Sequence, residues 1–102
     1  MSKVFAVMVE TAPGYSAYAL SHPDHNQRQR AWFVQMANEG KLLACGPYAP
    51  GEGTGLWLLR AANHEEAIAI TRTSPRFKDG MLAEEKTRIV EWTVSIGKER
   101  FA

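Results

Sequence analysis

The chain has little of several features that would narrow its function at once. It holds one cysteine in 102 residues, so no internal disulfide can form and a disulfide-stabilised scaffold is excluded. Its formal net charge is only +1, which provides no basic surface for nucleic acid. No apolar run approaches the roughly 18 residues that span a bilayer, and no signal-like segment opens the chain. We therefore expect a cytoplasmic protein with no nucleic-acid and no membrane partner.

Common catalytic signatures are absent as well. The sequence has no glycine-rich phosphate loop, no Cys-x-x-Cys pair, no Gly-x-Ser-x-Gly turn and no His-Glu-x-x-His helix. His22 and His25 flank a Pro-Asp pair, but nothing nearby completes a recognisable set of metal ligands. We therefore expect no metal and no cofactor. The remaining functions are proton transfer without a cofactor, or plain binding of a small molecule.

The residues that are present predict a single domain over residues 1–102. Apolar periodicity and turn residues predict strands at 4–9, 42–45, 56–60 and 87–94, with helices at 24–39 and 63–71. Asp24 and Asn63 are the expected N-caps, Gly40 ends the first helix and Pro75 the second. Segments 11–23 and 74–80 are expected as loops. This order predicts an α+β, ferredoxin-like βαββαβ fold, a four-stranded antiparallel sheet with two helices on one face.

Helices on one face leave the other face of the sheet uncovered. Trp57, Trp92 and their neighbours are expected to make that face too apolar for contact with water. We therefore predict a homodimer in which two sheets pack face to face.

A stripe of side chains along the first helix indicates a functional site. His25, Gln29, Trp32 and Met36 follow one another at spacings of four, three and four, and so share one face. Trp32 and Met36 must point to the core, which places Gln29 and His25 towards a cleft at the end of the helix. Because histidine transfers protons readily near neutral pH, His25 is the leading candidate for a general acid or base. The alternative is a surface histidine at the helix end.

The loop at 74–80 supplies further candidates. In this topology it approaches the start of the first helix, so Ser74 or Asp79 can orient a histidine there or bind a substrate hydroxyl. The alternative is a solvated, charged turn. His22 precedes the helix, and Tyr48 follows the second strand.

Several short segments together resemble the YCII-related family of small dimeric α+β barrel proteins. They are Asn38-Glu39-Gly40-Lys41-Leu42, Ala44-Cys45-Gly46-Pro47, Asn63-His64-Glu65-Glu66-Ala67, Ser74-Pro75-Arg76-Phe77 and Glu91-Trp92. The resemblance implies a dimeric α+β barrel, and it extends to members of the 5-chloro-2-hydroxyhydroquinone dehydrochlorinase type. It also implies a proton-transferring pair, a helix histidine and an aspartate before the late proline. Gln29 and Ser74 occupy those two positions here.

Two functions follow from this resemblance and its departures. The first is a cofactor-independent lyase or isomerase, resembling a dehydrohalogenase, that acts on a small hydroxylated aromatic or quinone-like compound in aromatic breakdown. In it, His25 and Asp79 form a displaced pair assisted by Ser74. His22 and Gln29 would contact the substrate, Trp32, Tyr48 and Phe77 would stack on its ring, and Arg76 or Arg28 would hold a phenolate.

The second function is a non-catalytic dimer that binds a small ligand and has lost the family His-Asp pair. A third hypothesis is a structural interaction domain that uses its exposed sheet.

Overall fold

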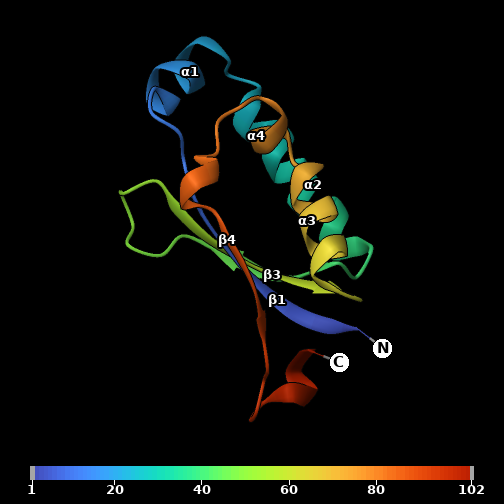
Figure 1. Cartoon of the computed structure of the whole chain (residues 1–102). Coiled ribbons are helices and arrows are strands. Elements are labelled where there is room, and N and C mark those ends of the chain that lie inside the picture. Colours follow the sequence, from blue (N-terminus) through green and yellow to red (C-terminus); the bar gives the residue numbers. More distant parts are fainter. Residues whose placement is uncertain (1, 102) are drawn as a thin grey trace.

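The computed structural model describes residues 2–101 and shows one antiparallel sheet with helices on one side (Figure 1). The strands are β1 (Lys3–Glu10), β2 (Leu42–Gly46), β3 (Thr54–Ala61) and β4 (Arg88–Trp92), in the spatial order β2-β3-β1-β4. Helix α2 (His25–Asn38) connects β1 to β2, and α3 (His64–Arg72) connects β3 to β4. This is the ferredoxin-like α+β fold that the sequence predicts.

The core lies between the sheet and helices α2 and α3. Alternate side chains of β1 and β3 point towards the helices, because successive residues of a strand face opposite sides. Each large apolar side chain buried there contributes about 1.5–3 kcal/mol to stability. The buried core includes Phe5, Val7, Val9, Trp32, Met36, Trp57, Leu59, Ala61, Ala67, Ile70 and Leu82.

Trp57 belongs to this core, so its expected place on the uncovered face is wrong. It is only 2% exposed, and its ring lies 5.4 Å from that of Trp32 and 5.2 Å from that of Phe33. The reason is the register of the sheet: Trp57 pairs with Val7, which also points towards the helices. Trp92 pairs with Val4 and is 43% exposed, as expected for the uncovered face.

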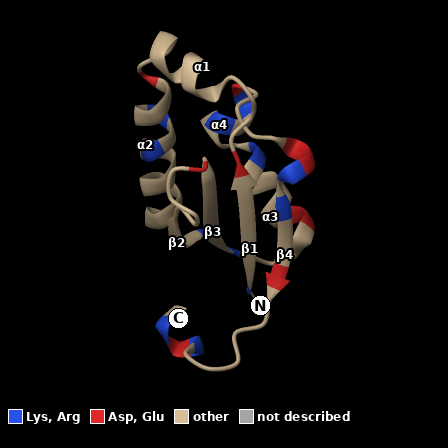
Figure 2. Cartoon of the chain, turned by 90° about the vertical axis from the view of Figure 1, so that its left-hand side faces the viewer, with Lys and Arg blue, Asp and Glu red and all other residues tan. Residues whose placement is uncertain are grey.

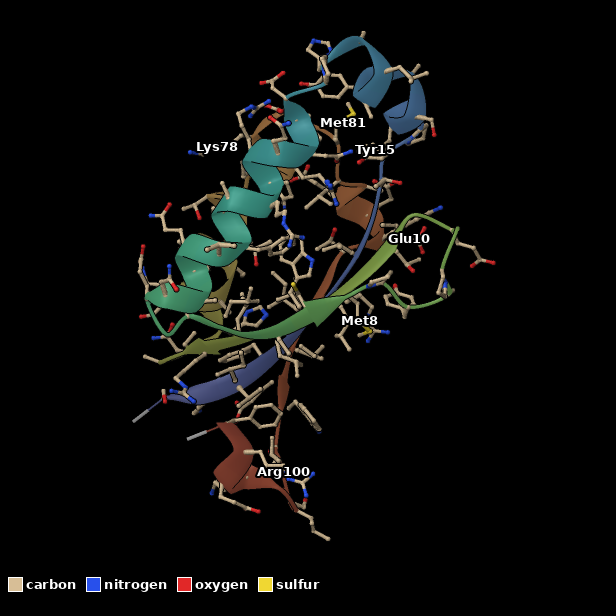
Figure 3. All side chains as sticks on the ribbon, turned by 180° about the vertical axis from the view of Figure 1, so that it is seen from behind. Met8, Glu10, Tyr15, Lys78, Met81 and Arg100 are labelled. Atoms are coloured by element: carbon tan, nitrogen blue, oxygen red, sulfur yellow. The ribbon has the colours of Figure 1, made fainter. Side chains whose placement is uncertain are left out.

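The uncovered face of the sheet remains strongly apolar without Trp57. Figure 3 shows Met8 on the side away from the helices, and Figure 2 shows few charged residues along the strands. The pairing register places these side chains together on what we call the open face: Val4, Ala6, Met8, Leu56, Leu58, Val90 and Trp92. Two arginines lie at its ends, Arg60 opposite Val4 and Arg88 opposite Met8. The short turn η2 (Lys98–Phe101) lies beyond β4, with the Phe101 ring 6.1 Å from Trp92.

Two short helices occupy segments that the sequence predicts as loops. Helix α1 (Tyr15–Ser21) fully buries none of its residues, so it carries no apolar period by which to recognise it. Gly14, at φ 85°, provides the left-handed turn into it. Helix α4 (Pro75–Lys78) forms the start of the late segment, and Ser74 caps it by accepting a hydrogen bond from the Phe77 N–H. Pro75 therefore begins α4, and α3 ends earlier, at Arg72.

The predicted helix ends are otherwise correct. Asn63 accepts a hydrogen bond from the Glu66 N–H at 2.9 Å, and Gly40 follows α2 at φ 75°. Asp24 occupies the N-cap position of α2, but its side chain pairs with Arg28 instead of capping. Within residues 2–101, no helix has both the length and the apolar character that crossing a membrane requires.

Candidate functional site

Helix α2 carries the polar centre of the site on its buried side. Its buried residues are His25, Gln29, Trp32 and Met36, the stripe that the spacing predicts. His25 is 0% exposed and Gln29 is 1% exposed. Both lie at the end of the helix near α1 and α4, where polar partners from those short helices replace apolar packing.

Asp79, which follows α4, holds one side of the His25 imidazole. The distance from Nδ1 of His25 to Oδ2 of Asp79 is 2.8 Å, although the two residues lie 54 positions apart in the chain. The same carboxylate oxygen accepts a hydrogen bond from Arg28, also at 2.8 Å, and Arg28 further binds Asp24. The contact between the late segment and His25 that the sequence suggested is therefore present.

These partners fix the charge of Asp79. The Arg28 guanidinium first, and then His25, lower the pKa of the Asp79 carboxyl from 3.8 to about 2. The two carboxylates also raise the pKa of Arg28. Asp79 is thus an anion throughout the neutral range, and its carboxylate accepts the Nδ1–H of His25.

Arg76 covers the other nitrogen of the same imidazole. Its Nε lies 3.5 Å from Nε2 of His25, and its terminal nitrogen donates to Oδ1 of Asn26 at 2.9 Å and to the Tyr15 hydroxyl at 3.4 Å. A guanidinium has only donors, so Nε2 must be the acceptor in this contact. With Nδ1–H facing Asp79, the hydrogen-bond pattern assigns a neutral imidazole whose lone pair points to Arg76.

Two tyrosines of α1 enclose the imidazole. The Tyr18 ring meets it edge-on at 5.2 Å, and the Tyr15 ring lies 5.9 Å away. The Arg76 guanidinium stacks over Tyr15 at 5.2 Å, and Tyr15 lies on the helix side of the sheet (Figure 3). Partial desolvation and the nearby Asp79 carboxylate raise the pKa of the Tyr18 hydroxyl.

A pocket of about 180 Å³ opens on the far side of Arg76 and Tyr15. A cavity of about 150 Å³ is enough to hold benzene, so this pocket accommodates a single small ring. Its other walls come from the ends of β1 and β3 and from the segment before β4: Val9, Thr11, Gly53, Thr54, Gly55, Trp57 and Leu82. Larger hollows lie elsewhere, including one between α3 and β4, but this pocket is bounded by two residues that touch His25.

Gln29 and Ser74 lie beside this arrangement, at the positions where the family resemblance implies a histidine and an aspartate. Oε1 of Gln29 accepts the backbone N–H of Arg76 at 2.9 Å, which ties α4 to α2. Ser74 is fully buried and caps α4. Both side chains thus fix the backbone of α4, and with it the position of Arg76.

Of the predicted site residues only Arg76 lines the pocket; His25, Gln29, Ser74 and Asp79 are not among its walls, and four others lie further away. His22 is exposed and stacks on Tyr18, with 4.0 Å between ring centroids. Trp32 belongs to the core and donates its Nε1–H to Thr73. Tyr48 is 38% exposed on the loop between β2 and β3, and Phe77 packs against the core below Arg72. None of them lines the pocket beside Arg76.

Sequence reasoning missed the contributions of Tyr15, Tyr18 and Asn26. The spacing of three between the tyrosines was a signal for a shared helical face, but the Pro-Gly turn before them favoured a loop. It also missed the pocket walls Gly55 and Trp57. Gly55 gives the pocket its width, since a Cβ there would lie 3.2 Å from Val9 and 3.3 Å from Trp57. Within residues 2–101, no cluster of histidine, cysteine or acidic side chains is arranged to hold a metal ion.

Comparison with known families identifies the fold more closely. Residues 5–93 match the YCII-related domain. The chain belongs to the YCII-related family. No curated protein gives a significant match to this YCII-related chain.

Two solved structures resemble this YCII-related protein. One is 5-chloro-2-hydroxyhydroquinone dehydrochlorinase from Burkholderia phenoliruptrix, in complex with 2,5-dihydroxybenzoquinone. It has a TM-score of 0.70 at 16% identity, and the match covers 88% of this chain and 93% of that one. The other is a putative antibiotic biosynthesis monooxygenase from Bacteroides thetaiotaomicron, with a TM-score of 0.56 at 16% identity, covering 93% of this chain and 90% of that one. At this identity the similarity establishes a shared fold.

Proposed function

We propose that this protein is a cofactor-independent lyase or isomerase that transfers protons on a small hydroxylated aromatic or quinone-like compound. The observation that carries the proposal is the buried His25, oriented by an Asp79 whose carboxyl pKa is about 2. A histidine with a fixed anionic partner on one nitrogen is suited to accept or donate a proton through the other. The ring-sized pocket behind Arg76 and the dehydrochlorinase of the same fold support an aromatic substrate.

The chemistry needs no redox partner. A proton moves from a ring hydroxyl to the ring carbon that bears chlorine. A second hydroxyl proton and the chloride then leave, as a carbon–oxygen single bond becomes a carbonyl. Together the two steps remove HCl from the compound, and they require no external electron acceptor. Nε2 of His25 is the proposed proton carrier, and an isomerase would use the first step alone.

Replacement of His25 tests this proposal. Because positioned acid–base groups contribute about 10²- to 10⁴-fold to rates, we expect His25→Ala to lower turnover at least tenfold. Chloride release and absorbance changes with chlorinated and unchlorinated hydroxyquinols are the measurements, and circular dichroism verifies the fold. The matched control is His64→Ala, since His64 is exposed and binds the Ile89 carbonyl outside the site. Equal turnover in wild type and His25→Ala would refute the assignment.

Two observations favour the second candidate function, a non-catalytic binding protein. Arg76 lies against the nitrogen that would move the proton, and Gln29 and Ser74 replace the family pair. In that case hydroxyquinols would raise the melting temperature without being converted to product.

We further propose that the protein acts as a homodimer in the cytoplasm. The open face supports the dimer, because apolar side chains of three adjacent strands lie there without a covering layer. A second copy of the same face supplies an equally apolar and self-complementary partner.

A further inference from the structure

Arg76 is a half-buried cation that has no carboxylate partner among residues 2–101. Its neighbours in hydrogen-bond or stacking contact are Asn26, Tyr15 and Nε2 of His25, none of which is an anion. Among residues 2–101, no carboxylate forms an ion pair with it, whereas Arg28 on α2 pairs with two carboxylates. Burial accordingly lowers the pKa of the Arg76 guanidinium. A charge removed from water is normally compensated by a counter-ion.

The position of Arg76 shows where such a counter-ion would fit. One side of the guanidinium meets His25, and the same side chain forms a wall of the 180 Å³ pocket. The remaining walls are mainly apolar and include Val9, Trp57 and Leu82. An apolar pocket with a single cationic wall is complementary to a flat ring that bears one anionic oxygen group.

A buried donor without a partner lies beside the backbone of Arg76. Gln29 uses Oε1 to hold the backbone N–H of Arg76, but its own Nε2 has no hydrogen-bond partner within residues 2–101 although it is fully buried. Leaving a buried donor unpaired is costly, so such groups are normally satisfied by protein, water or ligand. Gln29 does not line the pocket, but the Thr54 hydroxyl does, and it is likewise buried without a hydrogen-bond partner within residues 2–101. A ligand oxygen in the pocket would therefore meet a free hydroxyl as well as Arg76.

We propose that this pocket binds its ligand as an anion, a single-ring carboxylate or phenolate, and that the ligand displaces His25 as the partner of Arg76. A charge-assisted bond to an oxyanion is stronger than the 3.5 Å contact to imidazole. Arg76 therefore turns towards the pocket when the anion binds, and Nε2 of His25 becomes free to receive a proton. The release of Nε2 rests on the proposed function, whereas the anion site stands without it.

The test compares two probes of the same shape, benzoate and its neutral analogue benzamide, by isothermal titration calorimetry. Because hydrogen bonds to charged groups are worth roughly 1.5–3 kcal/mol, wild type should bind benzoate about tenfold or more tightly than benzamide. In Arg76→Gln this preference should disappear, while benzamide affinity stays within about twofold. The matched control is Arg30→Gln, which removes an exposed arginine from the outer side of α2 and should keep the preference.

Three outcomes would overturn the anion site: no benzoate binding to wild type, equal binding of both probes, or an unchanged preference in Arg76→Gln. An equal loss in Arg30→Gln would attribute the preference to net charge and would also overturn it. Histidine NMR supplies the second readout: benzoate should shift the His25 ring signals in wild type but not in Arg76→Gln. Turnover plays no part in these measurements, so failure of the proposed catalysis and failure of the anion site are distinguishable.

Discussion

At the residue scale, His25 has side chains of opposite charge beside its two ring nitrogens. Asp79 binds Nδ1 as an anion, and Arg76 lies at Nε2 as a cation. The spacing along α2 predicted that His25 faces inward, because positions four, seven and eleven residues further on carry Gln29, Trp32 and Met36. The direction of the Arg76 side chain was not predictable, because a short polar segment has no hydrophobic periodicity to show which of its side chains face inward.

The Asp79 cluster gives a pH-dependent prediction. The pKa of the Asp79 carboxyl is about 2 in the folded protein and 3.8 when the carboxyl has no partners, as in the unfolded chain. Ionised Asp79 therefore stabilises the fold above about pH 4. This contribution is lost as the pH falls from about 4 to about 2. We therefore expect Asp79→Asn to be less stable than wild type at neutral pH, and the difference to shrink across that acid range. Urea unfolding at several pH values measures it.

The control for this prediction is Glu85→Gln, which removes an exposed carboxylate outside the cluster. A stability difference between wild type and Asp79→Asn that stays constant from neutral pH to pH 2 would contradict the assigned role of the carboxylate.

At the element scale, the long elements were predictable and the short ones were not. Asn63 with Glu66 marked the start of α3, and Gly40 marked the end of α2, because capping chemistry is local. Helix α1 escaped prediction because none of its residues is fully buried. Helix α4 escaped because Ser74-Pro75 reads equally as a turn and as a cap followed by a first-turn proline.

The cap of α4 separates a structural from a catalytic role of Ser74. Loss of an N-cap hydroxyl costs about 1 kcal/mol, so Ser74→Ala should reduce the free energy of unfolding by about that amount. Ser74→Asp retains a capping acceptor but buries a charge, which makes Ser74→Thr the better rescue variant. Ser95→Ala, in an exposed segment, should change stability by less than about 0.5 kcal/mol. If Ser74 only caps, Ser74→Ala that is still folded keeps the turnover of wild type, and Ser74→Thr restores stability. Turnover that is lost in folded Ser74→Ala and restored in Ser74→Thr would give the hydroxyl a catalytic part.

At the scale of the whole molecule, the open face leads to the dimer prediction. Leu58 belongs to this face and pairs with Ala6 on β1 and Ala44 on β2. A buried, unpaired carboxylate is costly, so Leu58→Glu should convert a dimer into a monomer, as measured by size-exclusion chromatography with light scattering. Ile96→Glu is the control, because Ile96 is 94% exposed outside the sheet. A monomeric wild type at micromolar concentration would argue against the dimer.

The fold of the molecule was predictable because the order of strands and helices leaves few arrangements of a four-stranded sheet. The face assigned to Trp57 was wrong because strand parity depends on register, which a short apolar run does not fix. The pocket was not predictable either, since its walls come from three separate segments of the chain, within residues 9–15, 53–57 and 76–82.

The segment from Ser74 to Gly80 supplies both the cation and the anion that flank His25. The two charges beside that imidazole therefore come from one short segment, which α2 supports through Arg28 and Gln29. Grafting this segment between relatives would transplant the electrostatic setting of the histidine while leaving the sheet untouched. The charges around this histidine can therefore change during evolution through substitutions in a few consecutive residues.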